Sequence, residues 1–209
     1  SAVFGADAFS GVVNIITKTK LDIEGTEAGI RVGSFDTYDG WILHGANYAN
    51  FDVSLTLEYQ TTEGYKEIVK EDAQTQFDKL FGTNVSLAPG PVDTEYDVIH
   101  LRTDISRGDW RLRAGYHGTD NLGNGTGMAE ALDHSSHWAA DRFNLDVTWH
   151  DPHLTRYWDV TAQASYFYDD QNPNATGYQI VYPPGAMGGA FPVGFIGNPG
   201  FKEDQARLD

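Results

Sequence analysis

The sequence predicts an all-β protein built from long antiparallel strands, and three observations support this fold class. From Thr26 onward, apolar residues recur at every second position in one stretch after another, which is the pattern of strands with two chemically different faces. Short connections rich in turn-forming residues alternate with long ones. Aromatic residues stand at both ends of the apolar side in several stretches. The chain should therefore form a sheet with one face that avoids water and one that contacts it.

The first three expected strands, residues 28–34, 38–48 and 51–60, follow one another with only brief links between them. The third is the clearest, because apolar residues occupy every odd position from Phe51 to Tyr59 and polar residues occupy the even positions. The remaining four expected strands are residues 96–106, 110–119, 142–150 and 158–168. Most of these stretches have the roughly 9 to 12 residues that a tilted membrane-spanning strand requires.

Short and long connections alternate, so that one rim of the sheet should carry tight turns and the other long loops. The short connections are residues 48–50, 106–109 and 150–155. The long connections, rich in Gly, Pro, Asn, Asp and Glu, are residues 62–95, 121–137 and 169–209, with residues 35–37 as the one short link at that rim. Outer-membrane barrels have this asymmetry between periplasmic turns and extracellular loops.

Alternation by itself also fits a soluble β-sandwich, in which each sheet is half-buried. Two further features favour a membrane barrel. One side of each stretch consists almost throughout of polar and charged residues. The apolar side ends in aromatic residues at both rims, as with Phe51 and Tyr59 or Trp110 and Tyr116. Such rings lie at the level of the lipid headgroups in membrane barrels. We therefore expect an antiparallel transmembrane β-barrel portion of about seven strands, with short periplasmic turns and long extracellular loops.

The composition excludes several classes of protein. The 209 residues carry 14 Lys and Arg against 30 Asp and Glu, a formal net charge of -16, which argues against nucleic-acid binding because phosphate contacts need clustered basic residues. The absence of Cys excludes disulfides, thiolate zinc sites and cysteine nucleophiles. No run of about 20 apolar residues is present, so we expect no membrane-spanning helix. No catalytic arrangement stands out, and we expect neither an enzyme nor a cofactor.

Residues 1–20 differ from the strands. Small residues lead into a short apolar run, and the segment Phe4–Lys18 has the sequence Phe-Gly-Ala-Asp-Ala-Phe-Ser-Gly-Val-Val-Asn-Ile-Ile-Thr-Lys. This segment resembles the end of the plug domain of TonB-dependent outer-membrane receptors, which closes with an aromatic residue and Gly, an Asp-Ala pair, Gly-Val-Ile/Val-Asn-Ile-Ile-Thr and a basic residue. Residues 29–38 also resemble the first strand and hairpin of that family. Beyond Tyr65 the resemblance is architectural only.

The resemblance implies three parts in the chain. Residues 1–20 would end the plug domain, residues 21–25 would be a periplasmic linker, and residues 26–209 would begin the transmembrane barrel. Because barrels of this family have about 22 strands around a plug, the chain would be an internal fragment of a longer receptor. Seven strands cannot close such a barrel, so two unpaired sheet edges are expected.

For function, the resemblance implies active import of a scarce ligand, such as an iron–siderophore complex, across the outer membrane of a Gram-negative bacterium. The implied partners are the TonB–ExbB–ExbD energy-coupling complex, whose binding box is not in this chain, a small-molecule ligand such as a metal chelate, and lipopolysaccharide with outer-membrane lipid. Two alternatives stay open. One is a passive porin-like channel, against which residues 12–17 argue, and the other is a secreted soluble β-sheet domain that binds or acts on carbohydrate.

Four residues are candidates for contact with the ligand: Gln60, His100, His117 and Arg142. If the first barrel strand leaves the periplasm, odd-numbered strands run outward and even-numbered strands run inward, which puts these four on the water-facing wall near the outer mouth. They combine hydrogen-bond donors and cations. Alternatively, they pair with one another or with plug residues. We predict no catalytic and no metal-binding residue.

Two other motifs favour solvated loops over sites. His134 and His137 are three residues apart and would suit a metal ion if the segment were helical, but it is polar and rich in Gly. Glu67, Lys70 and Glu71 are spaced for a short helix with paired charges. As a hypothesis, acidic outer loops of this kind bridge divalent cations bound to lipopolysaccharide.

Overall fold

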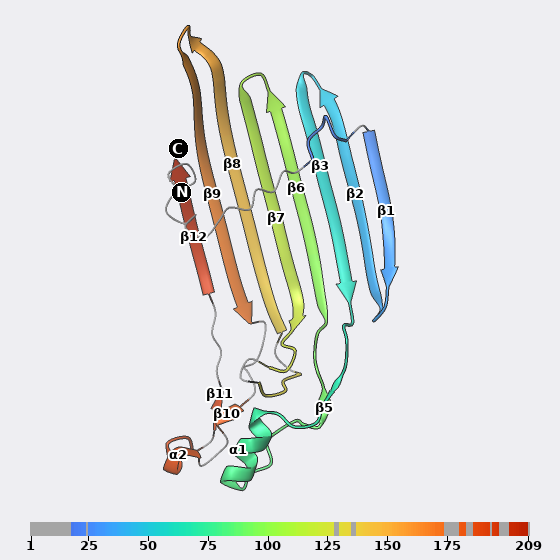
Figure 1. Cartoon of the computed structure of the whole chain (residues 1–209), viewed down its shortest axis with the longest axis vertical. Coiled ribbons are helices and arrows are strands. Elements are labelled where there is room, and N and C mark those ends of the chain that lie inside the picture. Colours follow the sequence, from blue (N-terminus) through green and yellow to red (C-terminus); the bar gives the residue numbers. More distant parts are fainter. Residues whose placement is uncertain are drawn as a thin grey trace.

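The computed structural model describes residues 18–23, 25–127, 130–134, 137–173, 180–182, 186–192, 194–196 and 201–208. Within these residues the protein is mostly antiparallel β-structure (Figure 1), which confirms the all-β fold class. Most of the segment that resembles a plug domain falls in residues 1–17 and lies outside the described residues.

Eight strands of the described residues form the main sheet. They are β1 (Gly25–Gly33), β2 (Thr37–Tyr48), β3 (Phe51–Thr62), β6 (Tyr96–Arg107), β7 (Trp110–Gly123), β8 (His137–Thr155), β9 (Trp158–Pro173) and β12 (Phe201–Leu208). The long connections hold the smaller elements β4 (Ile68–Val69), α1 (Ala73–Phe81), β5 (Gly90–Pro91), β10 (Ile180–Tyr182), α2 (Ala186–Gly189) and β11 (Phe195–Ile196). In the described part of the chain, no helix is long and apolar enough to cross a membrane.

The main sheet is an up-and-down meander in the order β1-β2-β3-β6-β7-β8-β9-β12. All seven expected strands are present, and every neighbouring pair is antiparallel. The sheet formed by the described strands is open, with β1 and β12 at its edges. The sequence does not predict β12, because Phe201–Leu208 mixes charged and apolar residues without alternation, and the loop expected over residues 169–209 is to that extent wrong.

The β8–β9 hairpin is longer than the sequence predicts. Residues 150–155, expected to form a connection, belong instead to β8, and the chain turns only after Thr155, which pairs with Trp158. The pairing is irregular between Asp151 and Thr155, where Pro152 has no N–H to donate to the ladder. The turn-like sequence therefore marks an irregular strand end rather than the turn itself.

The short and long connections lie at opposite ends of the sheet, as expected (Figure 1). The turns between β2 and β3, β6 and β7, and β8 and β9 lie at one end, which we call the turn rim. The long connections after β3, β7 and β9 lie at the other end with both helices, which we call the loop rim. At the turn rim Ala49 and Asn50 both have positive φ, 51° and 67°, as a two-residue turn needs to match the twist of its strands.

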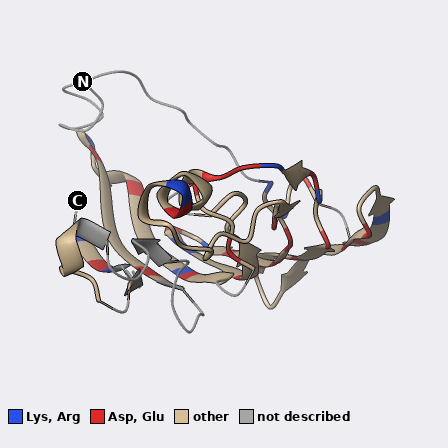
Figure 2. Cartoon of the chain, turned by 90° about the horizontal axis from the view of Figure 1, so that it is seen from below, with Lys and Arg blue, Asp and Glu red and all other residues tan. Residues whose placement is uncertain are grey.

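The two faces of the sheet differ in chemistry, as the alternation predicts. On one face, which we call the apolar face, a single register row consists of Leu57, Leu101, Tyr116, Phe143 and Tyr168 from five neighbouring strands. The intervening residues form the opposite, polar face. Figure 2, in which the strands are viewed nearly end-on, shows that the sheet is curved.

Burial on the two faces is the reverse of that in a soluble sheet. On the apolar face Ile30 is 82% exposed and Tyr59 is 49% exposed, whereas on the polar face Asp39 is 7% exposed and Ser54 is 4% exposed. The buried apolar side chains of the described residues are Ile23, Ala131 and Leu132, and none of them lies in the sheet. The described sheet therefore has no hydrophobic core of its own.

The loop rim is held by polar contacts around α1. Asp72 caps this helix and accepts hydrogen bonds from the backbone N–H of Thr75 (2.7 Å), the Ser86 hydroxyl (2.7 Å) and the backbone N–H of Leu132 (2.9 Å). It thereby joins three separate parts of the two long connections. Glu67–Glu71, whose charge spacing allows a short helix but which the sequence analysis assigned to a solvated loop, precedes the helix, which begins at Ala73 because the capping carboxylate is that of Asp72.

We predict that adjacent substitutions on opposite faces have unequal costs. Leu55→Arg places a charge on the apolar face and should reduce the free energy of unfolding in lipid by about 2–4 kcal/mol. Thr56→Arg places the same charge on the polar face, opposite Arg102 and two residues from Glu58, and should cost less than Leu55→Arg, about 1 kcal/mol at most, since a like charge directly opposite is only weakly destabilising. Denaturant titration of the protein folded in lipid vesicles measures both values, and equal costs would show that the faces are wrongly assigned.

We also predict that the α1 region loses stability in acid. Burial raises the pKa of Asp72, but hydrogen bonds from Ser86, Thr75 and the Leu132 backbone outweigh it and hold the pKa below its usual value. The stabilisation is therefore complete above the unfolded value of about 3.9 and is lost as the pH falls through the lower folded pKa.

Hydrogen exchange of the α1 amides, corrected for the intrinsic rate, checks this pH dependence. Asp72→Ala should lower the protection of α1 at neutral pH by about 1–2 kcal/mol and flatten its dependence on acid. A wild-type protein whose α1 protection is the same at pH 3 as at pH 6 would contradict the prediction.

Candidate functional site

A row of charged and imidazole side chains crosses the polar face at one level. In register, Glu58 on β3 lies opposite His100 on β6, His100 opposite His117 on β7, His117 opposite Arg142 on β8, and Arg142 opposite Asp169 on β9. We call these five residues the ionic row. Because antiparallel neighbours on one face have Cβ atoms only about 5 Å apart, the register places their side chains side by side.

Hydrogen bonds join the members of the ionic row. The Nδ1 atoms of His100 and His117 are 3.0 Å apart, so one of the two nitrogens carries a hydrogen and donates a hydrogen bond to the other. Arg142 Nε donates to Asp169 Oδ1 at 3.0 Å, and the Asp169 side chain is only 9% exposed. The two hydrogen-bonded pairs lie next to each other and together cross four strands, from β6 to β9.

The structure brings together three of the four residues that the sequence analysis selected. His100, His117 and Arg142 are consecutive members of the ionic row. Gln60 lies on the same face, one register step nearer the loop rim, opposite Val98. The shared face follows from the alternation, whereas the shared level depends on the register between strands.

A second polar group lies beside the ionic row, toward the turn rim. Arg102, Arg113 and Asn144 line a hollow on the polar face together with Thr56 and His100. Among the described residues no carboxylate forms an ion pair with Arg102 or Arg113. The Nε atom of Arg113 is buried and, within the same part of the chain, has no hydrogen-bond partner. These two arginines are the functional candidates that the sequence analysis missed, although the alternation does place them on the polar side.

The neighbouring carboxylates are already paired. Asp104 accepts hydrogen bonds from Arg111 Nε (3.0 Å) and Nη2 (2.5 Å). At the β1 edge Glu58 accepts from Arg31 Nη2 at 2.8 Å, and the guanidinium of Arg31 lies 4.8 Å from the centre of the Trp41 ring. Glu58, Asp104 and Asp146 also line the hollow, and Asp146, which lies opposite Arg113, accepts hydrogen bonds from Gln163 and Ser165. The hollow therefore presents cationic donors beside carboxylates that are bonded to other groups.

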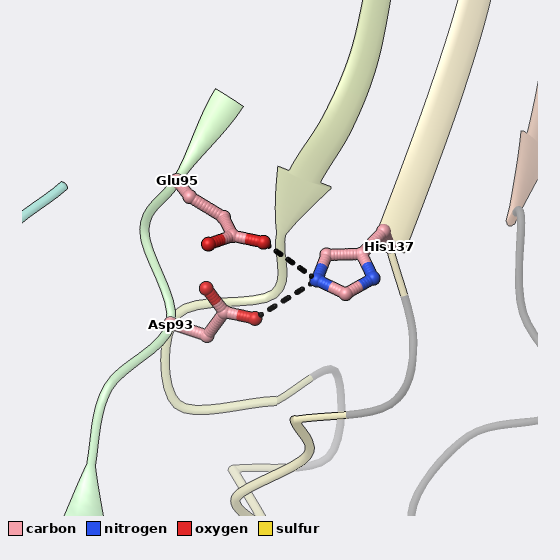
Figure 3. A group of neighbouring side chains, drawn as sticks. All are labelled: Asp93, Glu95 and His137. Atoms are coloured by element: carbon pink, nitrogen blue, oxygen red, sulfur yellow. Dashed lines mark ion pairs between the residues drawn. The ribbon is translucent and has the colours of Figure 1, made fainter. Parts of the chain in front are cut away.

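A separate cluster lies at the loop rim and contains Asp93, Glu95 and His137 (Figure 3). His137 Nε2 is 3.0 Å from Glu95 Oε1 and 3.4 Å from Asp93 Oδ2. These are the residues of the described part of the chain that could together hold a metal ion. The sequence analysis considered His137 with His134 and missed this grouping, because the two carboxylates come from a connection more than 40 residues away.

The segment Lys18–Ile23 lies against the polar face near the turn rim. A Cβ atom at Gly45 would be 2.1 Å from the carbonyl oxygen of Ile23, so only glycine lets the segment approach β2 this closely. Lys20 Nζ lies 3.9 Å from Asp52 Oδ1 at the start of β3. Lys18 itself lines the hollow that contains Arg102 and Arg113.

No known protein family, no curated protein and no solved structure matches this chain. What the fold defines is an all-β protein with a single large antiparallel sheet.

Proposed function

We propose that this chain forms part of the wall of an outer-membrane β-barrel that imports a ligand, as TonB-dependent receptors do. The observation that carries the proposal is the reversed burial of the sheet. Large apolar side chains such as Ile30 and Trp110 are exposed on one face, while carboxylates of the other face such as Asp104 and Asp169 are paired with arginines and largely buried. A membrane barrel needs this arrangement, because lipid covers the outside and water fills the inside.

The length of the apolar stretches fits a bilayer. On β3 the apolar positions extend from Phe51 to Tyr59, within the range of about 9–11 residues that a tilted transmembrane strand contains. Phe51, Trp110 and Trp149 lie toward the turn rim, where Trp110 is directly opposite Trp149. The apolar face thus ends in aromatic rings at this rim.

Tyrosines end the apolar face toward the loop rim. The hydroxyl of Tyr59 donates to Asp97 at 3.2 Å, and that of Tyr116 donates to Asp141 at 2.5 Å. Rings with an apolar body and a hydrogen-bonded polar tip suit the boundary between hydrocarbon and water. Aromatic girdles at both rims support a membrane location over a soluble sandwich.

The proposed orientation puts the turn rim in the periplasm and the loop rim outside the cell. It rests on the resemblance of Phe4–Lys18 to the end of a plug domain, and it is supported by the position of Lys18–Ile23 against the turn rim. By the same resemblance, the energy for import comes from the TonB–ExbB–ExbD complex. A passive porin-like channel and a soluble β-sheet domain remain the competing functions.

The polar wall favours a ligand rich in oxygen acceptors. Arg102 and Arg113 offer guanidinium donors without carboxylate partners in the described chain, and His100 and His117 lie beside them. Anionic chelates such as iron–siderophore complexes carry the carboxylate, hydroxamate or catecholate oxygens that such donors bind. We propose this class of ligand for the hollow.

We predict that the complete protein that contains this chain fractionates with the outer membrane. Because the apolar face would be covered by lipid, the protein should stay in the membrane pellet after washing with urea and leave it only with detergent. Separation of membranes on a sucrose gradient, followed by blotting, measures this. Recovery in the soluble periplasmic fraction would favour the β-sandwich alternative.

We predict that the polar wall contributes to uptake. Arg102→Ala and His117→Ala each remove a donor to the ligand and should weaken uptake of a radiolabelled iron–siderophore complex by about 10-fold in apparent affinity, since a hydrogen bond between charged groups contributes about 1.5–3 kcal/mol. His150→Ala is the matched control, because His150 lies on the same face but near the turn rim, hydrogen-bonded to Thr161. Equal uptake by all three variants, at equal surface amounts, would exclude the hollow as the site.

A further inference from the structure

We propose that Asp93, Glu95 and His137 bind a divalent transition-metal ion of the Zn²⁺ class. This inference does not depend on the proposed transport function, because it rests only on the geometry of the loop rim. One ligand atom from each of the three side chains lies within 4.8 Å of the other two (Figure 3). The sequence alone does not predict this cluster, since the three residues form no contiguous motif.

The distances suit a small metal ion. Zinc lies about 2.0–2.2 Å from imidazole nitrogen and carboxylate oxygen, so two ligand atoms in a tetrahedral site are about 3.3 Å apart. The observed separations, 3.0 Å between His137 Nε2 and Glu95 Oε1 and 3.4 Å between His137 Nε2 and Asp93 Oδ2, bracket this value. Small side-chain movements would therefore be enough to place an ion between the three atoms.

Backbone pairing holds the three side chains in place. Asp93 and Gly125 form an isolated β-bridge, with a 3.1 Å hydrogen bond from the Asp93 N–H to the Gly125 carbonyl. The carbonyl of Glu95 accepts from the Gly123 N–H at 2.9 Å, and Gly123 pairs in register with His137. The end of β7 thus lies between the segment with the two carboxylates and the first residue of β8.

Gly123 also makes room for the cluster. A Cβ atom at this position would be 2.5 Å from Asp93 Oδ1 and 2.6 Å from the Asp93 carbonyl oxygen. Only glycine therefore lets the Asp93 carboxylate lie against β7 and reach His137. The close approach is an observation independent of the clustering itself.

The charges of the cluster favour a cation. Two carboxylates face one imidazole, so the three groups together are negative whether His137 is neutral or protonated. Lys66, a cation of the same long connection, forms its ion pair with Glu63 at 3.1 Å. The Asp93 side chain is only 10% exposed, so water screens its charge poorly. A divalent ion would balance both carboxylates and would bind Nε2 in its unprotonated form.

The donor set selects the kind of ion. Calcium and magnesium prefer sites made of oxygen atoms alone, whereas one imidazole nitrogen with two carboxylate oxygens suits Zn²⁺ and neighbouring first-row metals. The three ligands leave a coordination position for water. A bound ion would join the β3–β6 connection to the start of β8 and so stiffen the loop rim.

The test is a titration of the metal-free, purified protein with Zn²⁺ in competition with a chromophoric chelator. We expect one ion per chain, and Asp93→Asn, Glu95→Gln and His137→Gln should each weaken binding by at least about 10-fold. His150→Gln is the matched control, because its imidazole faces a single carboxylate, Asp159, at 3.6 Å, and it should leave the affinity unchanged. Equal affinity of the wild type and His137→Gln would overturn the proposal.

A second measurement separates loss of the site from loss of the fold. Zn²⁺ should raise the thermal unfolding temperature of the wild type and of His150→Gln but not that of His137→Gln, while the metal-free proteins should unfold at similar temperatures. Co²⁺ in place of Zn²⁺ should give visible absorption bands that are lost in His137→Gln. A wild type without a metal-dependent shift would show that the cluster is only a network of ion pairs.

Discussion

The rest of this structure depends on one constraint, which is that the apolar face of the main sheet has no cover within the described chain. Neighbouring strands pair along most of their length, but the side chains that would form a core in a soluble protein point outward, as Ile30 and Trp110 do. Backbone pairing alone does not make such a sheet stable in water, because the main contribution that favours folding is the burial of apolar surface. The cover must therefore come from outside the described residues, and in the proposed barrel a bilayer would supply it over the length of the strands.

The same constraint explains the chemistry of the polar face. Side chains on the polar face are not held by apolar packing and are held instead by ion pairs. Acidic and basic residues from different strands accordingly pair, as with Arg31 and Glu58 or Arg142 and Asp169. Most of these pairs are half-exposed, and such pairs contribute little individually. Their effect here is to fix the positions of the paired side chains, while Arg102 and Arg113 on the same face have no carboxylate partner among the described residues.

The sequence predicts the faces well and the contacts between distant segments poorly. Alternation has a period of two, so a residue such as Leu55 is assigned to a face as soon as the strand is recognised. It fails for β12, whose charged residues occur on both faces, and for α1, whose start depends on the cap by Asp72 rather than on charge spacing. The metal cluster is beyond sequence reasoning for a further reason, since only the register between Gly123 and His137 brings His137 to the carboxylates.

The main sheet and the loop rim are thus stabilised by different interactions. The sheet requires an apolar environment, whereas the loop rim is held by buried polar groups, among them Asp72, which is 8% exposed, and Asp78, which accepts from the backbone N–H groups of Val85 and Ser86. A region held by hydrogen bonds to carboxylates responds to protons and cations, because both compete directly for those oxygens. In the proposed barrel, lipid would contact the apolar face and not these carboxylates. A metal ion bound by Asp93, Glu95 and His137 would act at the loop rim, where His137 begins β8, and would stiffen the end of the sheet that lipid does not cover.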